Sequence, residues 1–157
     1  MGNERTVLRK ISGNYYALAV KLESIDLPNT MVVDIEQEIV TETVTIDTTG
    51  GAGVAAGSAV MEITPNGFLL DIHLDYHASC PATADVTIND PTFGNILVKS
   101  NNATDICLAP RIGTVDAAAA ATGLYDLIPL NAPLTVSVAQ ANALTACLVA
   151  TIRWIKV

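Results

Sequence analysis

Hydrophobic and polar residues alternate along residues 31–47, which is the period of a β-strand with one buried face. Up to Ile39 the apolar residues occupy odd positions, as Val33 and Ile35 do, and from Val40 onward they occupy even positions. A β-bulge, or a sharp bend between two strands, would absorb this change of phase. We therefore expect strand structure throughout the segment, with an irregularity near Val40.

Further short apolar runs follow, separated by turns of the Pro-Asn-Gly and Asn-Asp-Pro type. These runs fall at residues 60–63, 68–76, 85–88, 96–98, 106–108 and 134–138. About eight to ten short strands with almost no helical periodicity predict an all-β fold, either a β-sandwich or a jelly roll.

The chain ends in a long apolar segment, residues 144–157. Its residues are apolar on both faces as far as Ile152, so we expect a final strand that lies inside the structure or between subunits. Residues 140–143 should form a hairpin connection before it, with an Ala-rich helix as the alternative. Composition leaves residues 116–123 open between one helical turn and a flexible loop.

Residues 48–58 follow a strand and are rich in glycine, so two nucleotide-binding motifs must be tested. A Walker loop needs a Lys directly before its final Ser or Thr, whereas Gly57 precedes Ser58 here. A dinucleotide fingerprint needs the spacing G-x-G-x-x-G, whereas Gly51, Gly53 and Gly57 are spaced G-x-G-x-x-x-G. Since neither motif fits, we expect a mobile surface loop.

Charge divides the chain into two unequal parts. The stretch between Lys21 and Lys99 contains twelve Asp and Glu but no Lys or Arg, whereas the first 21 residues hold four of the eight basic residues and one acid. The net charge of −8 argues against binding to nucleic acid or to an anionic membrane, because both select Lys and Arg.

Only 15% of the residues are charged, against about a quarter in ordinary soluble domains. We therefore expect much of the surface to face another subunit or partner. A monomer with a surface rich in Thr, Asn and Ala is the alternative.

We expect an N-terminal arm, residues 1–30, followed by a β-sandwich domain, residues 31–157. The basic arm suits an acidic protein partner, because complementary charge steers and orients an encounter, and tyrosines bury a large area at small entropic cost. The candidate partner-binding residues are Arg5, Arg9, Lys10, Tyr15, Tyr16 and Lys21. The alternative for the two tyrosines is packing on their own domain.

Three cysteines, Cys80, Cys107 and Cys147, are widely spaced and form no CxxC motif. An odd, scattered set fits buried free thiols better than a disulfide framework or a metal knuckle. We expect core cysteines and synthesis in a reducing compartment.

Both histidines lie in residues 71–77, where Asp71, His73, Asp75 and His77 would share the outer face of a strand. Positions i and i+4 of a strand stand about 13 Å apart, so His73 and His77 cannot chelate one ion without ligands from elsewhere. We expect a solvated or interface-facing polar surface, with no metal and no cofactor.

Nucleophilic catalysis has no motif to support it. Ser79 and Cys80 follow His77 in the sequence, but no activating pattern such as G-x-S-x-G surrounds them. We expect a protein that is not an enzyme. A sugar-binding module, or a metal-dependent enzyme that uses residues 71–77, is the least favoured alternative.

Residues 66–77, 94–98 and 133–142, followed by the long last strand, resemble small virion proteins of tailed bacteriophages, in particular the head decoration or cement class. The resemblance covers residues 58–157 and lies in short strands, small residues, an N-terminal arm and a terminal strand. It implies a β-rich homotrimer on the capsid exterior that bridges neighbouring coat subunits.

The expected partner is accordingly the major capsid protein, and the arm is the expected clamp. Synthesis in the host cytoplasm and residence in the virion follow from the same resemblance. A tail, head-fibre or host-attachment component is the alternative structural role.

Overall fold

The computed structural model describes residues 37–115 and 121–157, and every regular element in these residues is a β-strand. The strands are β1 (Glu38–Thr48), β2 (Ala55–Val60), β3 (Gly67–Tyr76), β4 (Asp85–Asp90), β5 (Gly94–Lys99), β6 (Ile106–Leu108), β7 (Arg111–Val115), β8 (Ala121–Leu127), β9 (Pro129–Leu130), β10 (Thr135–Ala141) and β11 (Leu144–Lys156). The expected arm, residues 1–30, lies outside the described residues.

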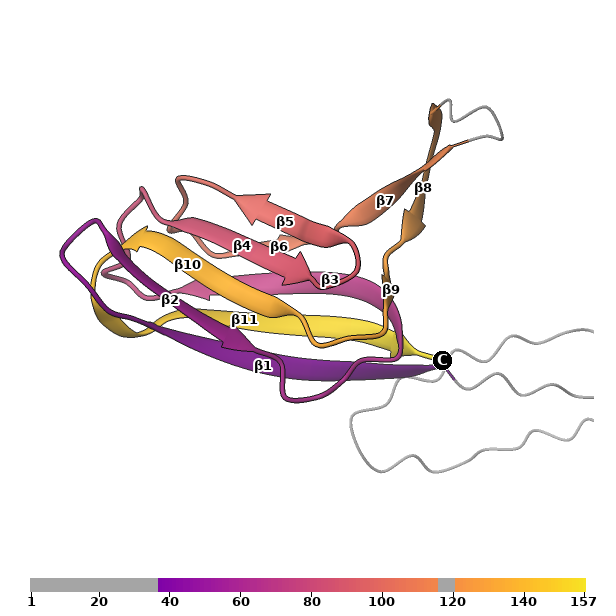
Figure 1. Ribbon diagram of the computed structural model, residues 1–157, viewed down its shortest axis with the longest axis horizontal. Helices are drawn as coiled ribbons and strands as arrows, with labels where there is room; N and C mark the ends of the chain where they lie inside the picture. The colour runs from indigo at the N-terminus through magenta and orange to yellow at the C-terminus, as the bar shows by residue number, and fades with distance from the viewer. Residues whose placement is uncertain (1–36, 116–120) are drawn as a thin grey trace, which may run out of the picture.

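Two antiparallel sheets pack face to face (Figure 1). One has the order β1-β11-β3-β6, with β9 added beside β3, and the other has the order β2-β10-β4-β5. At several points along the chain, two consecutive strands lie in opposite sheets, as β1 and β2, β3 and β4, and β10 and β11 do. A five-stranded and a four-stranded sheet linked in this way form a jelly roll, which confirms the expected all-β fold. The β7–β8 hairpin is a separate two-stranded sheet.

The core lies between the two sheets and is filled by alternate residues of their strands. The last strand is the centre of one sheet, because β11 pairs with β1 on one side and with β3 on the other. Its residues Leu148, Ile152 and Trp154 are buried in one core cluster with Val86 and Val136 of the second sheet. Burial of each such large side chain is worth about 1.5–3 kcal/mol, so the two-sided apolar character of this segment reflects its central position.

The bulge expected near Val40 is absent from the described part of β1. Pairing with β11 continues without a shift from Glu38 to Ile46, and the irregularity falls between Ile46 and Thr48. The change of phase has a different cause: Ile39 lies on the outer face, in one row with Ile155 and Phe68. Ile39 is therefore apolar because it belongs to an apolar row on the outer face, and β1 needs no bulge at this position.

The glycine-rich loop is shorter than predicted, because β2 already begins at Ala55 and pairs with β10. At Gly57 a Cβ atom would lie 1.9 Å from the carbonyl oxygen of Asp47. Only glycine therefore allows β1 and β2 to approach so closely. The predicted strand at 60–63 is wrong beyond Val60, since residues 61–63 are not part of a strand and residues 62 and 63 form a bend.

Residues 140–143 connect two sheets and do not form a hairpin or a helix, because β10 and β11 belong to opposite sheets. Asn142 holds this crossing in place. Its carbonyl accepts a hydrogen bond from Thr48 Oγ1 at 2.6 Å, and its side chain binds Gly53 N and Ser79 O, each at 3.1 Å. Of residues 116–123, Ala121 onward belongs to β8, and 116–120 lie outside the described residues.

Two of the three cysteines lie in the core as expected. Cys80 and Cys147 are buried, with their Sγ atoms 3.6 Å apart. Cys107 is exposed, which corrects the expectation for this residue. It lies opposite His73 in the β3–β6 pairing and so shares the outer face of the sheet.

Candidate interaction surfaces

A groove runs between β1 and β2, where the two sheets separate along one side of the jelly roll. It has a volume of about 380 Å³, and its lining includes Thr43, Val60, Glu62 and Ile63. Glu42 closes its floor: Oε1 of this buried carboxylate accepts a hydrogen bond from the backbone N–H of Glu62 at 2.5 Å. The groove therefore has a fixed base and an exposed mouth.

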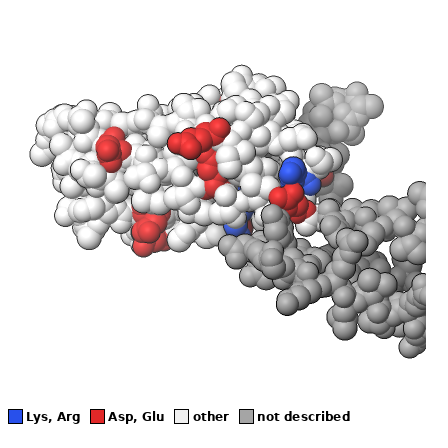
Figure 2. All heavy atoms as spheres, turned by 90° about the horizontal axis from the view of Figure 1, so that it is seen from below, with Lys and Arg blue, Asp and Glu red and all other residues white. Residues whose placement is uncertain are grey.

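The surface on this side of the molecule is mostly uncharged and carries acidic groups at several separate places. Figure 2 looks at the molecule from the side of β1 and shows acidic groups spread over the body, with the basic groups in view toward the end where β1 begins. The lining of the groove contains two Glu and no Lys or Arg. It therefore suits a cationic segment better than an anionic one.

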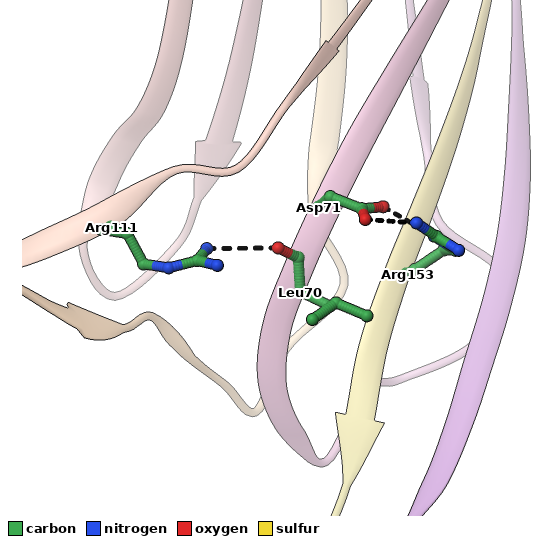
Figure 3. A network of polar contacts seen from close by, with 4 residues as sticks. All are labelled: Leu70, Asp71, Arg111 and Arg153. Carbon is green, nitrogen blue, oxygen red and sulfur yellow. Dashed lines mark hydrogen bonds and ion pairs between the residues drawn. The ribbon is translucent and has the colours of Figure 1, made fainter. Parts of the chain in front are cut away.

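The β7–β8 hairpin projects from the end of the jelly roll where β1 begins and β11 ends (Figure 1). Its base is fixed to β3 at a bulge, where Leu70 is the extra residue between Asp71 and Leu69. Arg111 Nη1 donates a hydrogen bond to the Leu70 carbonyl at 3.1 Å (Figure 3), and Leu69 N donates to Ile128 O at 2.8 Å. Both ends of the hairpin are thus attached to one strand.

Tyr125 is held in the open on this hairpin, with 71% of its surface exposed. It pairs with Gly113 across the two strands, and a Cβ atom on Gly113 would lie 3.9 Å from the Tyr125 ring. The ring therefore covers the position that the glycine leaves without a side chain. An exposed aromatic side chain of this kind is a common anchor in protein interfaces.

An apolar hollow of about 490 Å³ lies at the base of the hairpin. It is lined by Phe68, Phe93, Ile112, Asp126, Leu127 and Pro129. Phe68, Phe93 and Ile112 are all exposed, so three elements that are distant in the sequence contribute to one uncovered apolar surface. Such patches mark interaction sites on soluble proteins.

The histidine-bearing face is polar, as the sequence indicated. His73 and Asp75 are exposed on β3, and Asp71 pairs with Arg153 of β11 through its Nε atom at 2.7 Å (Figure 3). His77 lies beyond the end of β3, where its Nδ1 accepts a hydrogen bond from Ser79 N at 3.0 Å. In the part of the chain that the structure describes, no three His, Cys, Asp or Glu side chains are grouped so as to hold a metal ion.

The outer face of the second sheet is almost uncharged. Its exposed and half-exposed positions carry short side chains from all four strands: Ser58, Val60, Thr87, Asn89, Val98, Thr135 and Ser137. This face explains in part why the chain needs so few charged residues. Short side chains also lose little conformational entropy when a partner covers them.

The candidate residues of the arm, Arg5 to Lys21, lie outside the described residues, so their expected role stays a prediction. The sequence did not indicate the groove or the apolar hollow. The hollow had only a weak signal in the sequence, namely that Phe68 and Phe93 are the two phenylalanines of the chain; their exposure is visible only in the structure. The groove had no local signal, because it depends on the separation of two strands.

Comparisons with known proteins give one structural likeness. No protein-family model matches the chain, and no curated protein matches it. Among residues 37–115 and 121–157 there is no helix of the length and apolarity that would cross a membrane. A solved structure, the cryo-EM structure of the giant freshwater prawn Macrobrachium rosenbergii extra small virus VLP, is similar with a TM-score of 0.35 and 15% identity, over 88% of this chain and 92% of that chain.

Proposed function

We propose that this chain is a non-enzymatic structural protein of a virion, which binds the outside of a phage capsid as a homotrimer and stabilises the contacts between coat subunits. The observation that carries the proposal is the projecting β7–β8 hairpin with the apolar hollow at its base. A firmly attached hairpin presents Tyr125, and Phe68 and Phe93 lie uncovered beside it. Burial of such a surface by a protein partner is favourable.

Jelly rolls occur in viral capsid and lectin domains and in cupins, so the fold by itself does not select a function. The position of the polar residues favours a structural role. Sites for small molecules are concave, whereas His73 and Asp75 lie on the exposed outer face of a sheet. The space between the sheets is occupied by apolar side chains such as Leu74 and Ile152.

The hairpin end is the surface proposed to face the major capsid protein. The arm, through Arg5, Arg9, Lys10, Tyr15, Tyr16 and Lys21, is proposed to bind an acidic surface of a neighbouring subunit. The proposal places the protein on the exterior of the particle after synthesis in the host cytoplasm.

The test is to mix the purified full-length chain with capsids that lack it, and to measure both binding and the temperature at which the capsids open. The chain should bind to saturation and raise that temperature. A Phe93→Ser, Tyr125→Ser double variant should bind about tenfold more weakly or worse, since exposed aromatic anchors account for a large share of interface affinity.

Val54→Ser is the matched control. Val54 is 74% exposed and lies in the β1–β2 turn at the opposite end of the jelly roll, so this variant should bind as the unaltered chain does. Binding to tails in place of capsids would support a tail, head-fibre or host-attachment role. Equal binding by the double variant and the control would contradict the role of the hairpin end.

A further inference from the structure

The edge strand β1 leaves one side of its backbone open along the groove. In the described residues β1 pairs with β11, and no strand pairs with its other side between Glu38 and Thr48. The single bridge from Thr49 to Ala56 lies beyond the end of the strand. An edge with unpaired N–H and C=O groups can accept an added extended segment.

The groove has the chemistry for a segment that is both basic and apolar. Val60 and Ile63 are 55% and 47% exposed at its mouth, next to the exposed Glu62. The approach of Gly57 to Asp47 closes one end, and the strands separate from there toward Ile63. An occupant would cover apolar side chains and place cations near carboxylates, two contributions that favour binding.

We propose that this groove binds the segment Arg5–Lys10 from the N-terminal arm of a second copy of the chain. The inference rests on the proposed function, in which the arm binds a neighbouring subunit, and it identifies that subunit and the surface. In an extended conformation Arg5, Val7 and Arg9 point to one side at spacings of about 7 Å. Val7 then faces the apolar mouth, and the two guanidinium groups flank it.

Charge favours a second copy as the acceptor. The first 21 residues carry four bases and one acid, a charge of +3, which leaves −11 for the remainder of the chain. Two such acidic bodies repel each other. Binding of the basic arm of one copy to the acidic body of another offsets that repulsion with attraction. The 28 residues from Lys10 to Glu38 span up to roughly 90 Å when extended, so a neighbouring groove is within reach.

Charge reversal tests the contact in the full-length chain. Glu62→Lys should weaken self-association about tenfold or more, because it places a like charge beside the bound arginines. The double change Arg5→Glu, Arg9→Glu should do the same, and combining all three changes should restore association. Native mass measured over a range of protein concentrations and salt concentrations is the readout.

Asp75→Lys is the matched control, since it makes the same change of charge on the exposed outer face of β3. It should leave the native mass unchanged. If Asp75→Lys and Glu62→Lys weaken association equally, or if the charge swap does not restore it, the specific contact is overturned.

Cross-linking distinguishes a second copy from the chain's own arm. One chain carries Val7→Cys, a second chain of different mass carries Ile63→Cys, and both carry Cys107→Ser to remove the exposed thiol. Oxidation should yield a product with the summed mass of both chains. A single chain bearing both cysteines that closes only on itself, at every protein concentration, would overturn the exchange between copies.

The outcomes separate this inference from the proposed function. Deletion of residues 1–21 should abolish capsid attachment if the arm holds the protein to its neighbour. If this deletion abolishes attachment but Glu62→Lys leaves the native mass unchanged, the arm binds elsewhere and this inference is overturned alone. If the arm exchange is found but the assembled protein does not attach to capsids, the proposed function fails and the inference on self-association stands.

Discussion

Gly57 decides how closely the two sheets approach at one end of the jelly roll. Because a Cβ atom there would lie 1.9 Å from Asp47 O, Gly57→Ala must push β1 and β2 apart, at a cost of about 1–3 kcal/mol. Gly113→Ala is the control, since the nearest atom to its new Cβ is 3.9 Å away on the Tyr125 ring. Urea unfolding midpoints of the two variants measure their stability. Equal midpoints for Gly57→Ala and Gly113→Ala would contradict the close approach described at Gly57.

Cys80 makes stability depend on alkaline pH. Burial, and then the neighbouring Cys147 thiol, raise the pKa of the Cys80 thiol from 9.0 to about 12. As the pH rises above about 9, the unfolded chain therefore loses its proton before the folded chain does, and the free energy of unfolding falls until about pH 12. Burial also raises the pKa of Tyr76, which acts in the same direction.

We accordingly expect full stability from this group below pH 9 and a progressive loss between pH 9 and 12. Cys80→Ala should make the decline shallower, whereas Cys107→Ala, at an exposed position, should not alter it. For each variant, the difference between the urea unfolding midpoints at pH 8 and at pH 10.5 measures how steeply stability declines. A decline of the same steepness in both variants would show that Cys80 is not responsible.

At the scale of elements, the two buried thiols connect the β3–β4 loop to β11. Their Sγ atoms are 3.6 Å apart, so a shift of about 1.5 Å would bring them to bonding distance. Oxidised glutathione should convert the pair to a disulfide, with two protons and two electrons passing to form two reduced glutathione molecules. The cross-link closes a loop of 67 residues and should add about 4 kcal/mol to stability.

The check is intact mass and peptide mapping in a Cys107→Ser background, followed by urea unfolding. A Cys80–Cys147 peptide with a raised unfolding midpoint is the expected result. If the pair does not oxidise even where both thiols react with a small alkylating reagent, the proximity of the two sulfur atoms is contradicted. A lowered unfolding midpoint of the oxidised protein would contradict the packing described around them.

Strands with strong alternation could be predicted from the sequence, and those that depend on distant partners could not. β10 and β11 have period-two or continuous apolar patterns that are visible locally. β2, in contrast, consists mainly of Ala, Gly and Ser, which have weak strand preference, and it is a strand because β10 pairs with it. The sequence of residues 140–143 predicted a change of direction but contained nothing about which sheet follows.

The same division holds for the candidate surfaces. The alternating polar face around His73 and Asp75 was predictable from strand period alone. The groove needs the separation of β1 from β2, and the hollow combines Phe68, Phe93 and Ile112 from three elements. Such surfaces follow from topology, which period and spacing do not specify.

At the scale of the whole molecule, the acidic body and the basic arm are complementary parts of one chain. The body presents an acidic groove beside an open strand edge, a nearly uncharged sheet face and an apolar end with a fixed hairpin. Surfaces of these kinds suit contact with several neighbours at once. The proposed assembly into a homotrimer on a capsid would use all of these surfaces.

A cryo-EM reconstruction of particles that contain this protein tests that role most directly. We expect jelly-roll density in groups of three on the outer surface of the capsid, with the β7–β8 hairpin against the coat and each group bridging adjacent coat subunits. Density confined to the tail or to fibres, or density that forms the shell itself, would contradict it.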